Sequence, residues 1–502
     1  MSGIKKFLSD TVIYGLTTIV ARVLNFLLTP FFLRKFESSI YGIFTNLYSY
    51  AAMINAVLAF GMETTYFRFL QRVEKQDKEK VFNNSFFVTV FVTAIFVVSM
   101  FVFAGPIAGF IKSVDLDPSE YIVFIKLFAI ILGADALAVV PFARLRAEGR
   151  PIRYGVIKTI NIVVLVFCNL FLLYWFPSLI HKYAFWQEVA SGWFIEGWLG
   201  NVFISNLIAS VVTLVLLFPQ IAKFSFKVDS ALLKSMISYS FPILVANISF
   251  IINEHLDKMM FPKLVPTAQG ERDLGIYGAV AKIAIFLNLF VTAFRLGAEP
   301  FFFSYAKNEN ARQVYAKIME YFIIAMVIVM VGLCANIEWL KEFIRGGKLE
   351  QEVYWTGLYI VPILLFNNVL LGIYMNLSVW YRLSDQTRYG LYISGVGAII
   401  TVILNFTLIP TYSYLGASLS TTLTYFVMVG LSYSLGQKNY AIPYNTAKAI
   451  FYLLLAVAST AIMYYVFDNN IWLSNVLLVG VLVLVVYLER NFVSFVMQKI
   501  KK

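Results

Sequence analysis

The chain has 502 residues, of which 60% are hydrophobic and only 14% are charged. A soluble domain does not need so much apolar surface, so the composition excludes soluble enzymes and soluble binding proteins. Two histidines and two cysteines suggest neither a metal site nor a disulfide. We therefore expect an integral membrane protein without a metal or an organic cofactor.

Apolar runs long enough to cross a bilayer recur from one end of the chain to the other. We expect an all-α integral membrane fold with about 14 transmembrane helices. The predicted helices are residues 8–33, 42–65, 81–104, 121–142, 154–176, 199–220, 236–257, 275–297, 316–336, 354–377, 389–408, 415–435, 448–467 and 472–489.

The loop charges predict the orientation of these helices. Most of the 40 Lys and Arg residues fall in one set of loops, in which we include Lys158. Basic loops stay on the cytoplasmic side, so both termini are predicted to be cytoplasmic. The same bias explains the net charge of +12 without nucleic acid.

Two stretches indicate an internal repeat. Ile40-Tyr41-Gly42 through Gly61-Met62-Glu63 returns 236 residues later, at Ile276-Tyr277-Gly278 through Gly297-Ala298-Glu299. Each copy contains a long apolar run that we interpret as the second helix of a half. We predict two parallel six-helix halves, 1–221 and 222–436, followed by two added helices in 437–502.

Several motifs resemble those of a known superfamily. Asn405-Phe-Thr-Leu408-Ile409-Pro410 through Gly416-Ala417-Ser418 resembles a signature of the multidrug/oligosaccharidyl-lipid/polysaccharide flippases. Pro410 is expected to end helix 11. The stretches from Tyr14 to Pro30 and from Gly61 to Phe69 resemble the polysaccharide-transporter branch, which includes O-antigen flippases. The resemblance covers essentially the whole chain.

The resemblance implies a function without bond making, so we expect a transporter and not an enzyme. It implies alternating access that moves undecaprenyl-pyrophosphate-linked oligosaccharide from the cytoplasmic to the outer leaflet of the inner membrane. The unit would serve O-antigen, capsule or exopolysaccharide assembly. Membrane lipid and the polysaccharide polymerase machinery are further expected partners.

Charges inside helices are the candidate site, because each costs about 2.5–3.5 kcal/mol at a helix centre. Arg22, Lys282 and Arg295 are predicted to bind the pyrophosphate, whose geometry suits guanidinium groups. Snorkelling to the interface or a structural ion pair is the alternative for each of them. Asp135 is the candidate for coupling to H⁺ or Na⁺.

The remaining charged candidates are predicted to be gates or structural contacts. Glu63, which we expect to pair with Arg68, and Glu299 would latch the two halves near the cytoplasmic face. Glu254 and Asp257 would form an outer gate with Lys258.

Three rival functions stay open. A peptidoglycan lipid-precursor flippase looks richer in arginine across helices 1, 2 and 8. A multidrug extruder usually has twelve helices and acidic cavity residues. A membrane glycosyl-transferring enzyme would need an acidic catalytic site and a large loop, and neither is evident.

Overall fold

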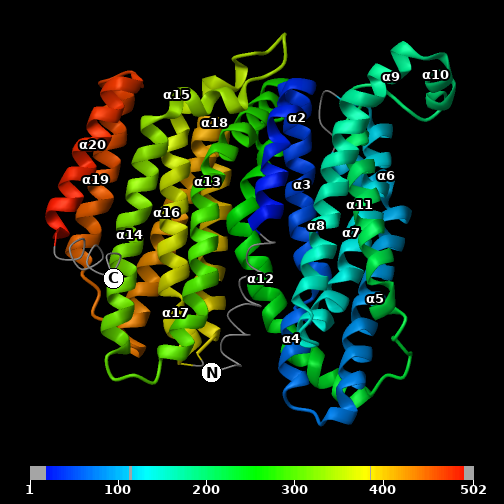
Figure 1. Ribbon diagram of the computed structural model, residues 1–502, viewed down its shortest axis with the longest axis horizontal. Helices are drawn as coiled ribbons and strands as arrows, with labels where there is room; N and C mark the ends of the chain where they lie inside the picture. Colours follow the sequence, from blue (N-terminus) through cyan, green and yellow to red (C-terminus); the bar gives the residue numbers. More distant parts are fainter. Residues whose placement is uncertain (1–18, 112–115, 385, 491–502) are drawn as a thin grey trace. The chain divides into compact units, whose positions relative to one another are not determined.

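The computed structural model describes residues 19–111, 116–384 and 386–490, except for the side chains at positions 75, 296, 297, 299, 300 and 304. These residues form helices and no strands (Figure 1). Among the described residues, twelve helices are long and apolar enough to cross a membrane, with residues 388–439 counted as one helix. This confirms the all-α membrane fold, while the count of fourteen depends on residues outside the described ranges and stays a prediction.

The contacts between residues divide the chain into two compact units. Unit 1 comprises residues 1–278, 346–351 and 394–414, and unit 2 comprises 279–345, 352–393 and 415–502. The predicted halves follow a sequence repeat and not compactness, so their boundaries stay predictions.

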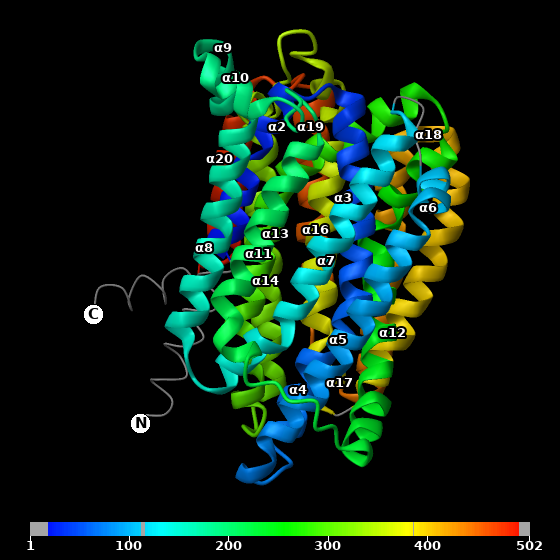
Figure 2. The same cartoon turned by 90° about the vertical axis from the view of Figure 1, so that its right-hand side faces the viewer.

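Unit 1 is a bundle of long helices that contact one another along their lengths (Figures 1 and 2). Residues 19–27 are helical and precede the first labelled helix. The elements are α2 (Thr29–Lys35), α3 (Ser38–Ala59), α4 (Met62–Leu70), η1 (Lys75–Asp77), α5 (Lys78–Val102), α6 (Ala104–Ile111), α7 (Pro118–Ala147), α8 (Pro151–Leu170), η2 (Phe171–Trp175), α9 (Phe176–Lys182), α10 (Ala184–Ala190), α11 (Gly200–Ile221) and α12 (Ser230–Leu264).

Unit 2 is a second helical bundle, in which α14 contacts both α16 and α19. Its elements are α14 (Ala311–Ala335), α15 (Ile337–Leu340), η3 (Lys341–Ile344), η4 (Val353–Ile360), α16 (Val361–Leu377), α17 (Val379–Leu383), α19 (Thr446–Tyr465) and α20 (Ile471–Leu488). Two helices, α13 (Ala268–Tyr305) and α18 (Arg388–Asn439), contribute residues to both units.

The predicted helix 42–65 is interrupted in the structure. Phe60 and Gly61 both have positive φ, 47° and 63°, which ends α3 and starts α4. Glycine tolerates this conformation because it has no Cβ. Gly61 therefore breaks the helix that we had expected to run through it.

The expectation that Pro410 ends helix 11 was wrong. The helix continues past Pro410, and the break lies at Ser413, where φ is 51° and ψ is −131°. The Ser413 hydroxyl donates a hydrogen bond to Asp273 of α13. The segment labelled α18 is thus two helices joined at Ser413, which agrees with the two that the sequence predicts.

The aromatic loop before α11 folds as a hairpin of α9 and α10 around Phe176. In the segment between α10 and α11, the carboxylate of Glu196 contacts Lys35 Nζ at 3.3 Å and His181 Nε2 at 3.0 Å. Burial by itself would raise the pKa of Glu196, but the hydrogen bonds with His181 and Lys35 hold it below its usual value. These contacts attach the hairpin to the end of α2.

Candidate functional site

A polar cavity of about 420 Å³ lies inside unit 1. Helices α3, α4, α7, α8 and α11 supply its walls. Its lining residues are Asn55, Ala59, Glu63, Asp135, Ala136, Ala138, Val139, Phe142, Tyr154, Lys158, Asn161 and Thr213. The predicted coupling residue Asp135 and the predicted latch residue Glu63 therefore line one cavity.

Asp135 is held in place by a neighbouring helix. It is half-buried, and Ser210 of α11 donates a hydrogen bond of 2.7 Å to its Oδ1. One carboxylate oxygen is thereby fixed by the protein. A hydrogen-bonded acid at the wall of a polar cavity is suited to exchange a proton or to bind a monovalent cation.

Lys158 is a functional candidate that our sequence analysis missed. We counted it among the cytoplasmic loops although the predicted helix 154–176 contains it. In the structure α8 begins at Pro151, and Lys158 lies in the second turn of that helix. Its ammonium lies 4.3 Å from the centroid of the Phe142 ring, a cation–π contact. Its place two turns inside a helix that starts with Pro-x-Arg was the available signal.

Amide and hydroxyl groups complete this cavity. The Asn161 amide donates hydrogen bonds to the Thr213 hydroxyl at 2.9 Å and to the Ala209 carbonyl at 3.1 Å. The described residues hold no group of three or more His, Cys, Asp or Glu that could bind a metal ion. The cavity therefore offers the carboxylates of Glu63 and Asp135, the ammonium of Lys158 and neutral oxygens, which suits reversible binding better than tight metal coordination.

Glu63 has a different partner from the one that we predicted. It forms an ion pair with Arg146 at the end of α7. The guanidinium of Arg68 lies 3.9 Å from the centroid of the Tyr239 ring in α12. Glu63 thus connects α4 to α7 within unit 1. The side chain of Glu299, its counterpart in the repeat, lies outside the described residues.

Asp257 and Lys258, two members of the predicted outer gate, contact each other, and Asp257 is 3% exposed. Lys258 Nζ lies 2.8 Å from Asp257 Oδ2, and the Tyr277 hydroxyl donates a 2.6 Å hydrogen bond to the same oxygen. Glu254 approaches His255 at 4.0 Å. These residues lie close together on α12, and both their outer position and a gating role stay predictions.

Asn46 supports this part of α12 through the backbone. Pro262 has no N–H, so the carbonyl of Lys258, four residues earlier, lacks its usual helical partner. The Asn46 amide donates to that carbonyl at 2.7 Å and to the Met259 carbonyl at 3.3 Å. Asn46 therefore ties α3 to the weakened turn of α12.

We expect Asn46→Leu to lower the free energy of unfolding by about 1–3 kcal/mol, because a buried carbonyl loses its donor. Thermal unfolding of the purified chain in detergent measures this. The exposed Asn439 bonds only to its own helix, at Leu435, so Asn439→Leu is the control and should change little. Equal stability of the two variants would refute the role of Asn46.

The helices that carry the two copies of the Tyr-Gly motif cross in unit 1. A Cβ built on Gly42 would lie 2.1 Å from the Glu271 carbonyl oxygen, and one on Gly275 would lie 1.9 Å from the Ser38 carbonyl oxygen. Helices α3 and α13 therefore cross at backbone contact, as small residues permit. Glu350, in the segment between η3 and η4, holds the start of α3, since its carboxylate accepts hydrogen bonds from the Ser38 N–H at 2.7 Å and hydroxyl at 3.0 Å.

The three predicted pyrophosphate ligands are distributed between the units. Arg22 is exposed on the helical residues 19–27 of unit 1, whereas Lys282 and Arg295 are half-buried on α13 in unit 2. Arg295 lines a small cavity and lies 3.9 Å from the sulfur of Met375. Whether the three residues serve one substrate stays a prediction.

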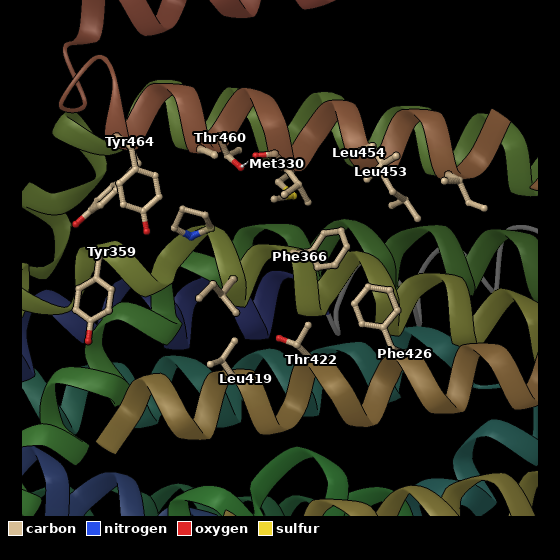
Figure 3. Close-up of a pocket in the computed structure, with 16 residues that line it drawn as sticks. Met330, Tyr359, Phe366, Leu419, Thr422, Phe426, Leu453, Leu454, Thr460 and Tyr464 are labelled. Carbon is tan, nitrogen blue, oxygen red and sulfur yellow. Dashed lines mark hydrogen bonds between the residues drawn. The ribbon is translucent and has the colours of Figure 1, made fainter. Parts of the chain in front are cut away.

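Unit 2 contains an apolar cavity of about 490 Å³ between α19 and the helices α16 and α18 (Figure 3). Figure 3 shows Leu453 and Leu454 on one wall, with Phe366 and Phe426 on the other. The hydroxyl of Thr422 in this lining donates to Asn367 at 2.6 Å, so it is satisfied within the protein. The remaining surface suits a hydrocarbon chain.

The comparisons agree with this architecture. Residues 242–407, less than half of the chain, match the MatE family model. No curated protein matches the chain.

Solved transporter structures match it over most of its length. A lipid II flippase MurJ in an inward closed conformation has a TM-score of 0.71 at 13% identity, covering 96% of this chain and 100% of its own. An inward-facing multidrug resistance MATE transporter of the MOP superfamily has a TM-score of 0.61 at 12% identity, covering 85% and 94%. An outward-facing MATE transporter of the same superfamily has a TM-score of 0.57 at 14% identity, and the match covers 90% of this chain and 95% of its own. At these identities the likeness shows a shared multi-pass membrane fold.

Proposed function

We propose that the chain is a flippase of the multidrug/oligosaccharidyl-lipid/polysaccharide superfamily. Its substrate is a polyprenyl-diphosphate-linked oligosaccharide, which it moves from the cytoplasmic to the outer leaflet of the inner membrane. Both termini face the cytoplasm, and the predicted halves alternate their access to the two sides. The oligosaccharide would then pass to the polymerase machinery.

The apolar cavity of unit 2 is the observation that carries the lipid part of this proposal. One of its walls is α19, which belongs to the pair of helices predicted beyond the two six-helix halves. A twelve-helix extruder would have no equivalent wall. A hydrocarbon tail in this cavity would remain in an apolar surrounding while the charged diphosphate crosses elsewhere.

The polar cavity of unit 1 supports a driving force for the proposal. Binding alone cannot produce net transport, so energy must come from an ion gradient or from consumption of the product. Asp135 and Lys158 contribute an acid and a base to one cavity. Uptake of H⁺ or Na⁺ at Asp135 would change the charge balance of this cavity and thereby bias the transporter between its states.

Two alternatives each have a supporting observation. The lipid II flippase has the higher TM-score of the structures described above and is matched over its full length, which favours a peptidoglycan precursor as substrate. The MatE match and the carboxylates of Glu63 and Asp135 in the unit 1 cavity favour a multidrug extruder. Both lead to different substrates on the same fold.

Photocrosslinking tests the proposed substrate. A polyprenyl-diphosphate oligosaccharide with a photoreactive group on its tail should label peptides of α16 and α19 in wild type. Thr422→Trp, which fills the cavity, should reduce this labelling, whereas Val476→Trp on the exposed surface of α20 should not. Unlabelled competitor should displace it, and displacement by lipid II or a cationic dye alone would contradict the proposal in favour of the corresponding alternative.

A further inference from the structure

A second, small cavity in unit 2 combines groups that favour an anion. It has a volume of about 20 Å³, and its lining includes Arg295 of α13, Arg382 of α17 and Asn376 of α16. The other lining residues are Val291, Phe294, Ala298, Phe302, Gly372, Met375 and Val379. All polar side chains in the described lining are therefore able to donate hydrogen bonds, and two of them are cationic.

Asn376 is the decisive member of this set. Its side chain is 6% exposed, and its amide nitrogen is buried without a hydrogen-bond partner. A buried amide N–H without an acceptor is costly, so native structures nearly always provide one. An oxygen atom of a ligand in the cavity would supply that acceptor.

The packing of α13 on α16 places Arg295 beside this amide. Asn288 donates a 3.1 Å hydrogen bond to Asn368, and Arg295 contacts Met375. Both contacts join residues that lie one heptad apart on each helix, so they repeat on one face of the pair. Asn376 directly follows Met375, and Arg382 lies on the short helix that continues α16 (Figure 1).

We propose that Arg295, Arg382 and Asn376 form a phosphoryl-binding site inside unit 2. A cavity of about 20 Å³ accommodates a single oxygen atom, so one phosphoryl oxygen accepts the Asn376 amide hydrogen bond. The two guanidinium groups bind the remaining oxygens, for which their planar donors are suited. Only the identity of the ligand rests on the proposed function: we assign the phosphoryl group to the diphosphate of the lipid-linked substrate.

Pyrophosphate binding to the full-length chain in detergent tests the site. We expect inorganic pyrophosphate to raise the melting temperature of wild type. Arg382→Ala and Asn376→Leu should each weaken binding about tenfold, as loss of a charge-assisted or buried hydrogen bond does. Asn376→Asp should do the same by adding a negative charge to a side chain of equal size. Arg388→Ala removes an exposed arginine of the same unit and should bind as wild type does.

Two further ligands identify the source of the phosphoryl group. Farnesyl diphosphate should stabilise wild type in an Arg382-dependent way, and phosphatidylglycerol in nanodiscs should not. Stabilisation by phosphatidylglycerol alone would overturn the assignment to a diphosphate substrate. The melting temperature without ligand reports whether each variant folds, and Arg382→Lys keeps the charge if Arg382→Ala does not fold. Equal pyrophosphate affinity in wild type and all folded variants would overturn the site, even if the chain flips the lipid-linked oligosaccharide.

Discussion

Asp135→Asn should reduce ion-driven transport about tenfold or more, because it removes the charge that an ion would neutralise. Glu63, the other carboxylate of the cavity, is already paired with Arg146. Asparagine can still accept the hydrogen bond from Ser210, so the fold should be retained. Transport in proteoliposomes with an imposed pH or Na⁺ gradient measures the effect.

The controls for Asp135 separate charge from packing. Asp135→Glu keeps the carboxylate and should retain part of the ion dependence, while Glu188→Gln removes an exposed carboxylate of α10 and should have no effect. Transport by Asp135→Asn that responds to both gradients as wild type does would show that coupling lies elsewhere.

Gly42→Ala should disrupt the crossing of α3 and α13. The new methyl group would meet the Glu271 carbonyl oxygen at 2.1 Å, and backbone atoms cannot move aside as a flexible side chain can. Overpacking of this kind costs about 1–3 kcal/mol, against a gain of about 1 kcal/mol from replacing glycine in a helix. We therefore expect a lower melting temperature and weaker transport.

Gly332→Ala is the matched control for this crossing. Gly332 lies within α14, and a Cβ there would have no atom within 4 Å, so alanine should keep or raise stability. If Gly42→Ala and Gly332→Ala shift the melting temperature in the same direction by the same amount, the crossing does not depend on glycine.

The helices were predictable because apolar runs and helix length are local properties. The interruptions were less so. The glycine at position 61 is a local signal for a break, but we predicted a helix through it. The break at Ser413 is associated with a contact to Asp273, which is 140 residues away in the sequence. Pro410 was assigned too much weight, because a proline in a membrane helix can be accommodated when its neighbours satisfy the freed carbonyl.

The site shows the same division between local and distant information. Asp135 was recognised as a charge inside an apolar run, which needs no partner. Lys158 was missed because we counted it with the basic loop before it, although the predicted helix 154–176 already contains it. Asn46 and Asn376 are neutral, and their importance depends on a backbone carbonyl and a cavity that the folded chain creates. Sequence patterns mark charges in helices but not the groups that complete a site around them.

The proposed flippase activity is tested most directly by the leaflet position of a fluorescent polyprenyl-diphosphate oligosaccharide in sealed proteoliposomes. A membrane-impermeant quencher added outside quenches only the label in the outer leaflet of the vesicles. Our account predicts that wild type makes nearly all the label accessible, that Arg22→Ala slows this exchange, and that protein-free vesicles keep about half protected. If vesicles with wild type protect as much label from the quencher as protein-free vesicles do, with or without an ion gradient, the proposal is contradicted.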